Sequence, residues 1–158
     1  MVVELGLFAL ILALLLSCAQ AFFGLAGPAI GNRRWMAAAR PAVAGQFVFV
    51  ALSFAVLAWA FYKNDFSVLY VANNSNSALP TFYRFSAVWG AHEGSLLLWA
   101  LSLSAWSIAV AVFSKNLPET FAARVLGVLG FVSIGFQGFI LFTSNPFLRL
   151  DPPPLDGR

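Results

Sequence analysis

Four long stretches without a single charged side chain constrain this chain more than any other feature. They cover residues 5–32, 41–62, 94–114 and 125–148. Each exceeds the roughly 20 residues with which an α-helix crosses a hydrocarbon core about 30 Å thick. Because lipid offers the backbone no hydrogen bonds, a segment that crosses it must satisfy its own, as a helix does. We therefore predict an all-α integral membrane protein with four transmembrane helices, at about residues 6–25, 42–62, 95–113 and 122–142.

The composition supports this class. The 158 residues are 61% hydrophobic and only 9% charged, whereas a soluble domain is about one quarter charged. The net charge of +3 is spread between the apolar runs, so we predict no nucleic-acid partner. The single cysteine, Cys18, excludes an intrachain disulfide, and no cluster of cysteine and histidine has metal-ligand spacing. We therefore predict no metal site.

The first apolar stretch has two other interpretations. A cleaved signal peptide needs a basic start, but Glu4 makes this one acidic. Residues 15–18 loosely resemble a lipoprotein cleavage site, yet the apolar run continues past Cys18. We favour a retained helix in which Cys18 is a buried small hydrophobe.

Basic residues indicate the orientation. The connection before the second predicted helix carries three arginines and no acid, whereas acids accompany the basic residues of the long loop 63–90 and the tail 144–158. The residues compared are Arg33, Arg34, Arg40, Lys115 and Arg124 with Glu119 on one side, and Lys63, Arg84, Arg149 and Arg158 with Asp65, Asp151 and Asp156 on the other. The more basic connections should be cytoplasmic. We expect the amino end, the loop and the tail outside.

The long outer loop has three parts. Residues 66–71 form a β-like run, residues 72–77 form a turn cluster, and Pro80 follows. From there Phe82, Phe85, Trp89 and His92 recur at spacings of three and four. We predict a short amphipathic helix over residues 80–90, lying at the outer interface and leading into the third transmembrane helix.

Other residues indicate how the helices begin and pack. Pro41 and Pro118 are predicted to begin the second and fourth helices. Small residues on one face of the fourth helix would let another helix approach closely; they are Gly127, Gly130 and Gly138. Gln20, Gln46 and Gln137 are predicted to form hydrogen bonds between helices.

The strongest candidate for chemistry is the pair His92 and Glu93 at the mouth of the third helix. A neutral imidazole can ligate haem iron or relay a proton, and ionisable groups at membrane depth are usually functional. The alternative remains open that both lie in the headgroup layer, with Glu93 stabilising the helix amino end. Trp89 and Trp99 are likewise either residues of an aromatic belt or the wall of a cofactor site.

These residues resemble a known family. Residues 89–99, WGAHEGSLLLW, closely resemble the signature of the haem lyase subunits of the CcmF and NrfE type, from cytochrome c maturation. The resemblance continues through residues 64–72, 74–76, 79–84 and 139–147, in the family's order. It implies a multi-pass protein of the bacterial inner membrane. It also implies that the protein receives haem from a periplasmic haem chaperone and, with other haem lyase subunits, helps attach it to apocytochrome c.

The chain also departs from the family. Family members are several times longer, and their tryptophan-rich segment and haem-ligating histidines lie in later segments. We therefore expect an amino-terminal portion that does not bind haem stably alone. Within it, Arg84, Trp89, His92 and Glu93 are the candidate haem-facing surface. Two other functions stay open: a transporter or ion relay through His92 and Glu93, and a purely structural membrane scaffold.

Overall fold

The computed structural model describes residues 2–114, 116–149 and 155–157, and every regular element among them is a helix. Four helices are long: α1 (Val2–Ile30), α2 (Arg33–Tyr62), α5 (His92–Phe113) and α6 (Glu119–Phe142). Two are short: α3 (Leu69–Asn74) and α4 (Thr81–Ala87). Each long helix has the length and apolar composition needed to cross a membrane. This confirms the predicted all-α class with four membrane-spanning helices.

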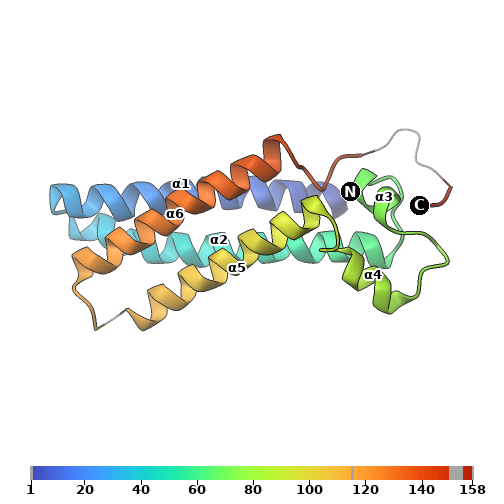
Figure 1. Ribbon diagram of the computed structural model, residues 1–158. Coiled ribbons are helices and arrows are strands. Elements are labelled where there is room, and N and C mark those ends of the chain that lie inside the picture. Colours follow the sequence, from blue (N-terminus) through green and yellow to red (C-terminus); the bar gives the residue numbers. More distant parts are fainter. Residues whose placement is uncertain (1, 115, 150–154, 158) are drawn as a thin grey trace.

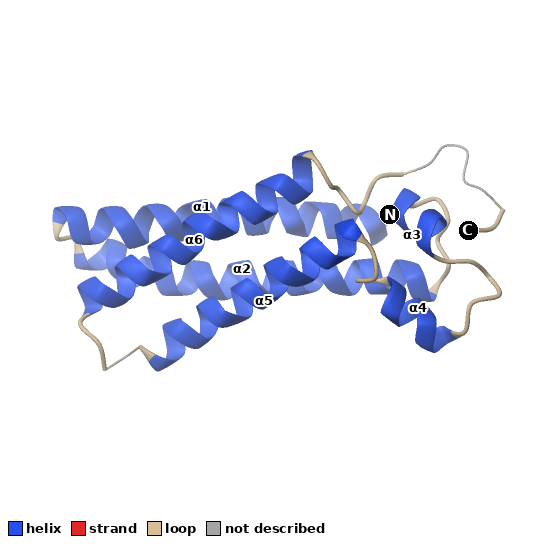
Figure 2. Cartoon of the chain, in the orientation of Figure 1, coloured by secondary structure: helices blue, strands red, loops and turns tan. Residues whose placement is uncertain are grey.

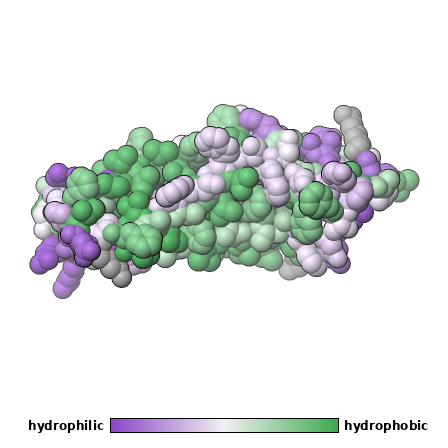
Figure 3. Space-filling model, turned by 60° about the horizontal axis from the view of Figure 1, so that its bottom comes forward, coloured by the Kyte–Doolittle hydropathy of each residue, from purple (hydrophilic) through white to green (hydrophobic). Residues whose placement is uncertain are grey.

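The long helices form one elongated bundle (Figure 1). α1 packs along α2 and α6, and α5 packs along the same two helices, so α1 and α5 lie diagonally opposite. α3, α4 and the start of α1 lie together at one end (Figure 2), which we call the loop end. The α1–α2 and α5–α6 connections lie at the other end, which we call the turn end. Hydrophobic residues cover the middle of the bundle, and hydrophilic residues gather at both ends (Figure 3).

The helices are longer than the predicted spans, most clearly at the start of α2. Asn32 caps this helix, because its side-chain oxygen accepts hydrogen bonds from the backbone N–H groups of Arg34 (3.0 Å) and Trp35 (3.3 Å). Pro41 consequently lies inside α2, and the expectation that it begins the helix is wrong. Pro118 does directly precede the first residue of α6, Glu119, as predicted.

Glycines bring α1 and α6 into backbone contact. A Cβ atom added to Gly24 would lie 2.6 Å from the Cα and N atoms of Gly127, and one added to Gly130 would lie 2.8 Å from the N atom of Ala21. The predicted close approach therefore occurs within the chain. Gly138 takes no part in it, since no described atom other than the backbone of α6 itself lies within 4 Å of its Cβ position.

Buried amides connect the same two helices. Ser17 donates to Oε1 of Gln137 over 3.0 Å, and Nε2 of Gln20 donates to the carbonyl of Leu126 over 2.7 Å. These contacts confirm the predicted interhelical bonding for Gln20 and Gln137. Gln46 is also fully buried, but neither of its amide atoms has a partner among the described residues.

Cys18 corrects another expectation, because it is exposed on the surface of the bundle. The neighbouring positions Ser17, Gln20 and Ala21 form the buried face of α1. α1 is apolar on all sides, so its sequence alone does not indicate which face is buried.

The loop end also differs from expectation. The predicted β-like run is wrong: only Val68 pairs in β fashion, in a single bridge to Arg149, and α3 begins at Leu69. The predicted amphipathic helix is α4, but it ends at Ala87, so Trp89 and His92 lie beyond it. Of the residues used to predict orientation, Lys115, Asp151 and Arg158 lie outside the described residues.

Candidate functional site

A tight backbone junction separates α4 from α5 and determines where the candidate residues lie. The carbonyl of Val88 packs directly on Gly94 in the first turn of α5, so a Cβ atom at Gly94 would collide with that carbonyl oxygen and lie 2.5 Å from the Tyr70 hydroxyl. Val88 itself is fully buried. This close approach therefore requires a glycine at position 94, which explains the second glycine of the WGAHEG run.

Tyr70 of α3 connects the loop to this junction. Its hydroxyl donates to the carbonyl of Val88 over 3.0 Å, with the carbonyl of Ala91 a further 3.3 Å neighbour. Its ring packs edge-on against Phe61 of α2 at 5.4 Å between centroids. Burial raises the pKa of the Tyr70 phenol above its ordinary value. The phenol therefore remains a neutral donor, and sequence analysis missed its role.

His92 is the first residue of α5, and its ring meets the end of α6. Its Nε2 atom lies 2.8 Å from the hydroxyl oxygen of Ser144, and its ring packs edge-on against Phe139 at 6.3 Å. Ser144 is buried, whereas His92 is exposed. Among the described residues, Nε2 is the only ring nitrogen of His92 with a hydrogen-bond partner, so the other nitrogen is free to meet a further group.

Glu93 faces a small polar hollow beside the same segment. The hollow has a volume of about 80 Å³. Its lining comes from α3, the start of α5 and the segment after α6: Leu69, Tyr70, Asn73, Asn74, Glu93, Thr143, Ser144, Asn145 and Leu148. Because Ser144 both lines this hollow and holds His92, the two ionisable residues share a neighbour while pointing in different directions.

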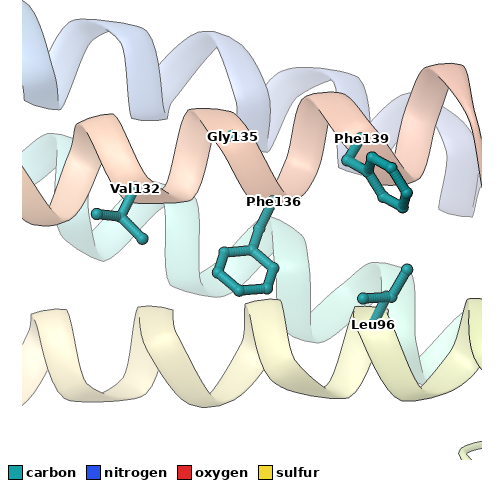
Figure 4. Close-up of a pocket in the computed structure, with 5 residues that line it drawn as sticks. All are labelled: Leu96, Val132, Gly135, Phe136 and Phe139. Atoms are coloured by element: carbon teal, nitrogen blue, oxygen red, sulfur yellow. The ribbon is translucent and has the colours of Figure 1, made fainter.

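An apolar groove lies between α5 and α6 in the membrane-spanning part (Figure 4). It has a volume of about 330 Å³ and is lined by Leu96, Val132, Gly135, Phe136 and Phe139. Phe139 contacts the His92 ring, and Phe136 stacks on Trp99 at 6.4 Å between centroids. The groove therefore joins an imidazole at one end to aromatic rings along its length.

Arg84 lies apart from this site. Its guanidinium reaches backward to the carbonyls of Ser77 (3.3 Å) and Tyr62 (3.5 Å). Trp89 is exposed beside the junction, with 45% of its surface accessible. Of the four predicted site residues, the structure brings His92 and Glu93 together around Ser144, and it gives Arg84 a separate place between α2 and α4.

Two sets of polar contacts at the loop end, which we call clasps, were not predicted. Arg149 pairs with Glu4 of α1 at 2.8 Å and with Asp65 at 3.7 Å, and it also donates to the hydroxyl of Ser67. Asp156 accepts hydrogen bonds from the backbone N–H (2.8 Å) and hydroxyl (2.9 Å) of Ser77, which lower the pKa of its carboxyl group. Both clasps join residues remote in sequence, and no local pattern reveals such pairs.

The arrangement brings polar and apolar groups together at the loop end. It combines one imidazole, one carboxylate, an apolar aromatic groove and several hydroxyl and amide groups. Within the described ranges, no group of three or more histidine, cysteine, aspartate or glutamate residues is placed to hold a metal ion. The fold and the site thus define a multi-pass α-helical membrane protein with polar and apolar groups side by side at its loop end.

Comparison with known proteins identifies the family. The chain is 60% identical over 159 residues to the cytochrome c-type biogenesis protein CcmF of Pseudomonas aeruginosa and 44% identical over 162 residues to NrfE of Haemophilus influenzae. Each match covers the whole chain but only 24% and 25% of the relative. A solved structure titled cytochrome c heme lyase CcmF matches 94% of the chain and 25% of its own, with a TM-score of 0.89 and 30% identity. No protein-family model matches.

The chain belongs to the CcmF and NrfE family of cytochrome c-type biogenesis proteins and corresponds to the amino-terminal portion of its relatives. It spans about a quarter of their length.

Proposed function

We propose that this chain forms the amino-terminal membrane part of a haem lyase, which attaches haem to apocytochrome c at the outer face of the bacterial inner membrane. The observation that carries this proposal is similarity along the whole of this chain to cytochrome c-type biogenesis proteins, at up to 60% identity. Other haem lyase subunits, a periplasmic haem chaperone and apocytochrome c would be its partners. Haem is the cargo in this scheme and is handed on.

The proposed orientation places the loop end outside the cell membrane. At the turn end, the described residues include four arginines and one acid: Arg33, Arg34, Arg40, Arg124 and Glu119. At the loop end, acids accompany the basic residues: Glu4, Asp65, Glu93 and Asp156 with Lys63, Arg84 and Arg149. Since basic residues are retained on the cytoplasmic side, this asymmetry favours an outer loop end.

The α5 helix has a length that supports a position of His92 at the membrane boundary. Its 22 residues extend about 33 Å at about 1.5 Å per residue, close to the roughly 30 Å hydrocarbon core. In this proposal, His92 lies where the apolar α5–α6 groove meets the headgroup layer. The groove suits the apolar ring of haem, whereas the anionic propionates need basic partners, which the polar hollow beside the Glu93 carboxylate does not offer. In this proposal, His92, Glu93 and Trp89 face the cargo, and Arg84 offers charge to a propionate.

A chimera tests the family function directly. This chain replaces the corresponding amino-terminal part of the P. aeruginosa relative, in a strain that lacks its own copy. Covalent haem on a reporter cytochrome c is then measured, together with the membrane level of the chimera. We expect maturation close to that of the intact relative. A chimera that reaches the membrane at normal levels but matures no cytochrome would overturn the proposal.

Substitutions in the chimera test the site. His92→Ala and Glu93→Ala are expected to lower covalent haem at least several-fold at unchanged protein level. Ser102→Ala is the matched control, because Ser102 is exposed on the same helix and bonds only to the carbonyl of Leu98 in its own helix (3.0 Å). Normal maturation in both site variants would remove His92 and Glu93 from the haem-facing surface, even if the chimera itself works.

A further inference from the structure

A second groove, at the turn end, joins a positive charge to an apolar channel. It lies between α2 and α5, has a volume of about 230 Å³, and is lined by Arg40, Val43, Ala44, Ile108, Ala111 and Val112. Val43 is fully buried, whereas Val112 is 50% exposed. The apolar floor thus opens sideways, toward the surface that lipid covers.

The guanidinium of Arg40 is fixed at the mouth of this groove. It donates to the carbonyl of Ala111 and reaches the hydroxyl of Ser114 at 3.4 Å, both at the carboxyl end of α5. These acceptors hold the side chain in place, and the helix end supplies partial negative charge. Neither acceptor carries a formal charge, so the positive charge of Arg40 is only partly compensated.

The ion pairs of the described residues leave Arg40 without a carboxylate. Glu119 is the acid described at the turn end, and it pairs with Arg33 at 3.4 Å. No described carboxylate lies within 4.0 Å of the Arg40 guanidinium. A half-buried cation beside an apolar channel therefore lacks a matching anion within the described part of the chain.

The depth of Arg40 indicates where that anion comes from. α5 is just long enough to span the hydrocarbon core, and Arg40 contacts its last turn, so the guanidinium lies at the level of the lipid phosphates. Anionic headgroups attract basic side chains at this level. An anionic lipid presents a phosphate at this level with an acyl chain directly below it.

We infer that the α2–α5 groove is a binding site for an anionic phospholipid, whose phosphate contacts Arg40 and whose acyl chain lies along Val43, Ala44 and Ile108. The site is independent of haem and of the proposed haem lyase function. It is more specific than general attraction to a charged membrane, because it requires both the guanidinium and the open channel.

Native mass spectrometry of the purified protein tests the site with two probes of identical acyl chains, palmitoyl-oleoyl phosphatidylglycerol and the corresponding phosphatidylcholine. We expect the wild type to retain phosphatidylglycerol several-fold more strongly. Arg40→Gln keeps a donor for the Ala111 carbonyl but loses the charge, so the preference for phosphatidylglycerol should disappear. Arg34→Gln is the control, because it removes the same charge from an exposed position in the first turn of α2.

A second variant tests the contribution of the apolar channel to lipid binding independently of the charge. Ala44→Trp fills the exposed side of the groove and leaves Arg40 in place, so retention of phosphatidylglycerol should fall several-fold. Equal losses in Arg40→Gln and Arg34→Gln would show general electrostatic attraction and overturn the site. Wild-type retention in Ala44→Trp would do the same, and this result decides the matter if Arg40→Gln fails to fold.

Discussion

The hydroxyl of Tyr70 donates to the carbonyl of Val88 over 3.0 Å, and the same carbonyl packs on Gly94. This contact fixes the α4–α5 junction to α3. Because His92 follows Val88 by four positions and begins α5, the loop determines where the imidazole lies relative to Ser144 and the α5–α6 groove.

Gly94→Ala is predicted to displace the junction, while Gly90→Ala is tolerated. A Cβ atom at Gly94 collides with the Val88 carbonyl, whereas the nearest atom to one at Gly90 is the Ser86 carbonyl oxygen at 3.4 Å. We expect Gly94→Ala to cost about 1–3 kcal/mol, as for other overpacked sites, measured by thermal unfolding in detergent. In the chimera, its cytochrome maturation should fall as well. Equal stability of the two variants would contradict the junction described above.

Tyr70 predicts a loss of stability at alkaline pH. Burial raises the pKa of the Tyr70 phenol in the folded state above its value of about 10 in the unfolded state. The stabilisation by Tyr70 is therefore fully present below the unfolded-state pKa, and it is lost as the pH rises through the folded-state pKa. Tyr70→Phe should lower stability by about 1 kcal/mol near neutral pH and flatten the alkaline decline. Unfolding temperatures measured across this range check both effects, with Tyr83→Phe, an exposed tyrosine of α4, as the control.

The crossing of α1 and α6 predicts that valine substitutions at two glycines have very different effects on stability. Gly24→Val places new atoms against the backbone of Gly127 and Ala123, and this should cost at least 1–3 kcal/mol or separate the helices. Gly138 lies on α6, and its valine variant meets no described atom within 4 Å of its Cβ apart from the backbone of α6 itself. Denaturant unfolding in micelles should therefore detect the first change and hardly the second. Similar losses at both positions would mean that α6 packs by a different face.

Removing Arg149 should loosen the loop end without unfolding the bundle. Arg149→Met breaks the pairs with Glu4 and Asp65. Since the pairs are partly exposed, the cost should be ~1 kcal/mol or less and should shrink at high salt. Hydrogen exchange should speed up at residues 65–69 and in the first turn of α1. Arg33→Met, which breaks the pair with Glu119 at the turn end, should leave those amides unchanged.

Cysteine labelling from the two sides of the membrane checks the proposed orientation. In a Cys18→Ala background, Ala78→Cys at the loop end should react with an impermeant maleimide added outside intact spheroplasts. Asn116→Cys at the turn end should react only after the membrane is opened. Both positions are exposed in the structure. The reverse pattern would place His92 on the cytoplasmic side, and the proposed haem-facing role would fail with it.

The sequence predicts the membrane-spanning helices well, because uncharged runs of more than 20 residues have few other stable structures in lipid. It also predicts that Gln20 and Gln137 form hydrogen bonds between helices, since buried amides in a membrane find partners on other helices. It does not predict which residues accept or donate these bonds. The expectation that Cys18 is buried fails, because a helix that is apolar on all sides gives no periodic signal for its buried face.

The loop end was the least predictable region. Residues 66–71 have β-forming side chains, but tertiary contacts decide their structure: Tyr70 must reach Val88, and Val68 pairs with Arg149. Likewise, the spacing of Phe82, Phe85, Trp89 and His92 fits one helix, but the approach of Val88 to Gly94 interrupts it. The roles of His92, Glu93, Trp89 and Arg84 remain predictions for the experiments above.

Several contacts that close the loop end come from the last part of the chain. Ser144 holds His92, the carbonyl of Leu148 accepts from the N–H of Leu69 at 2.8 Å, Arg149 clasps Glu4, and Asp156 holds Ser77. During translation, α1 and α2 leave the ribosome well before these residues are made. The periphery around His92 therefore takes its final shape only after α6 has been synthesised and inserted, so the bundle forms first and the loop end last.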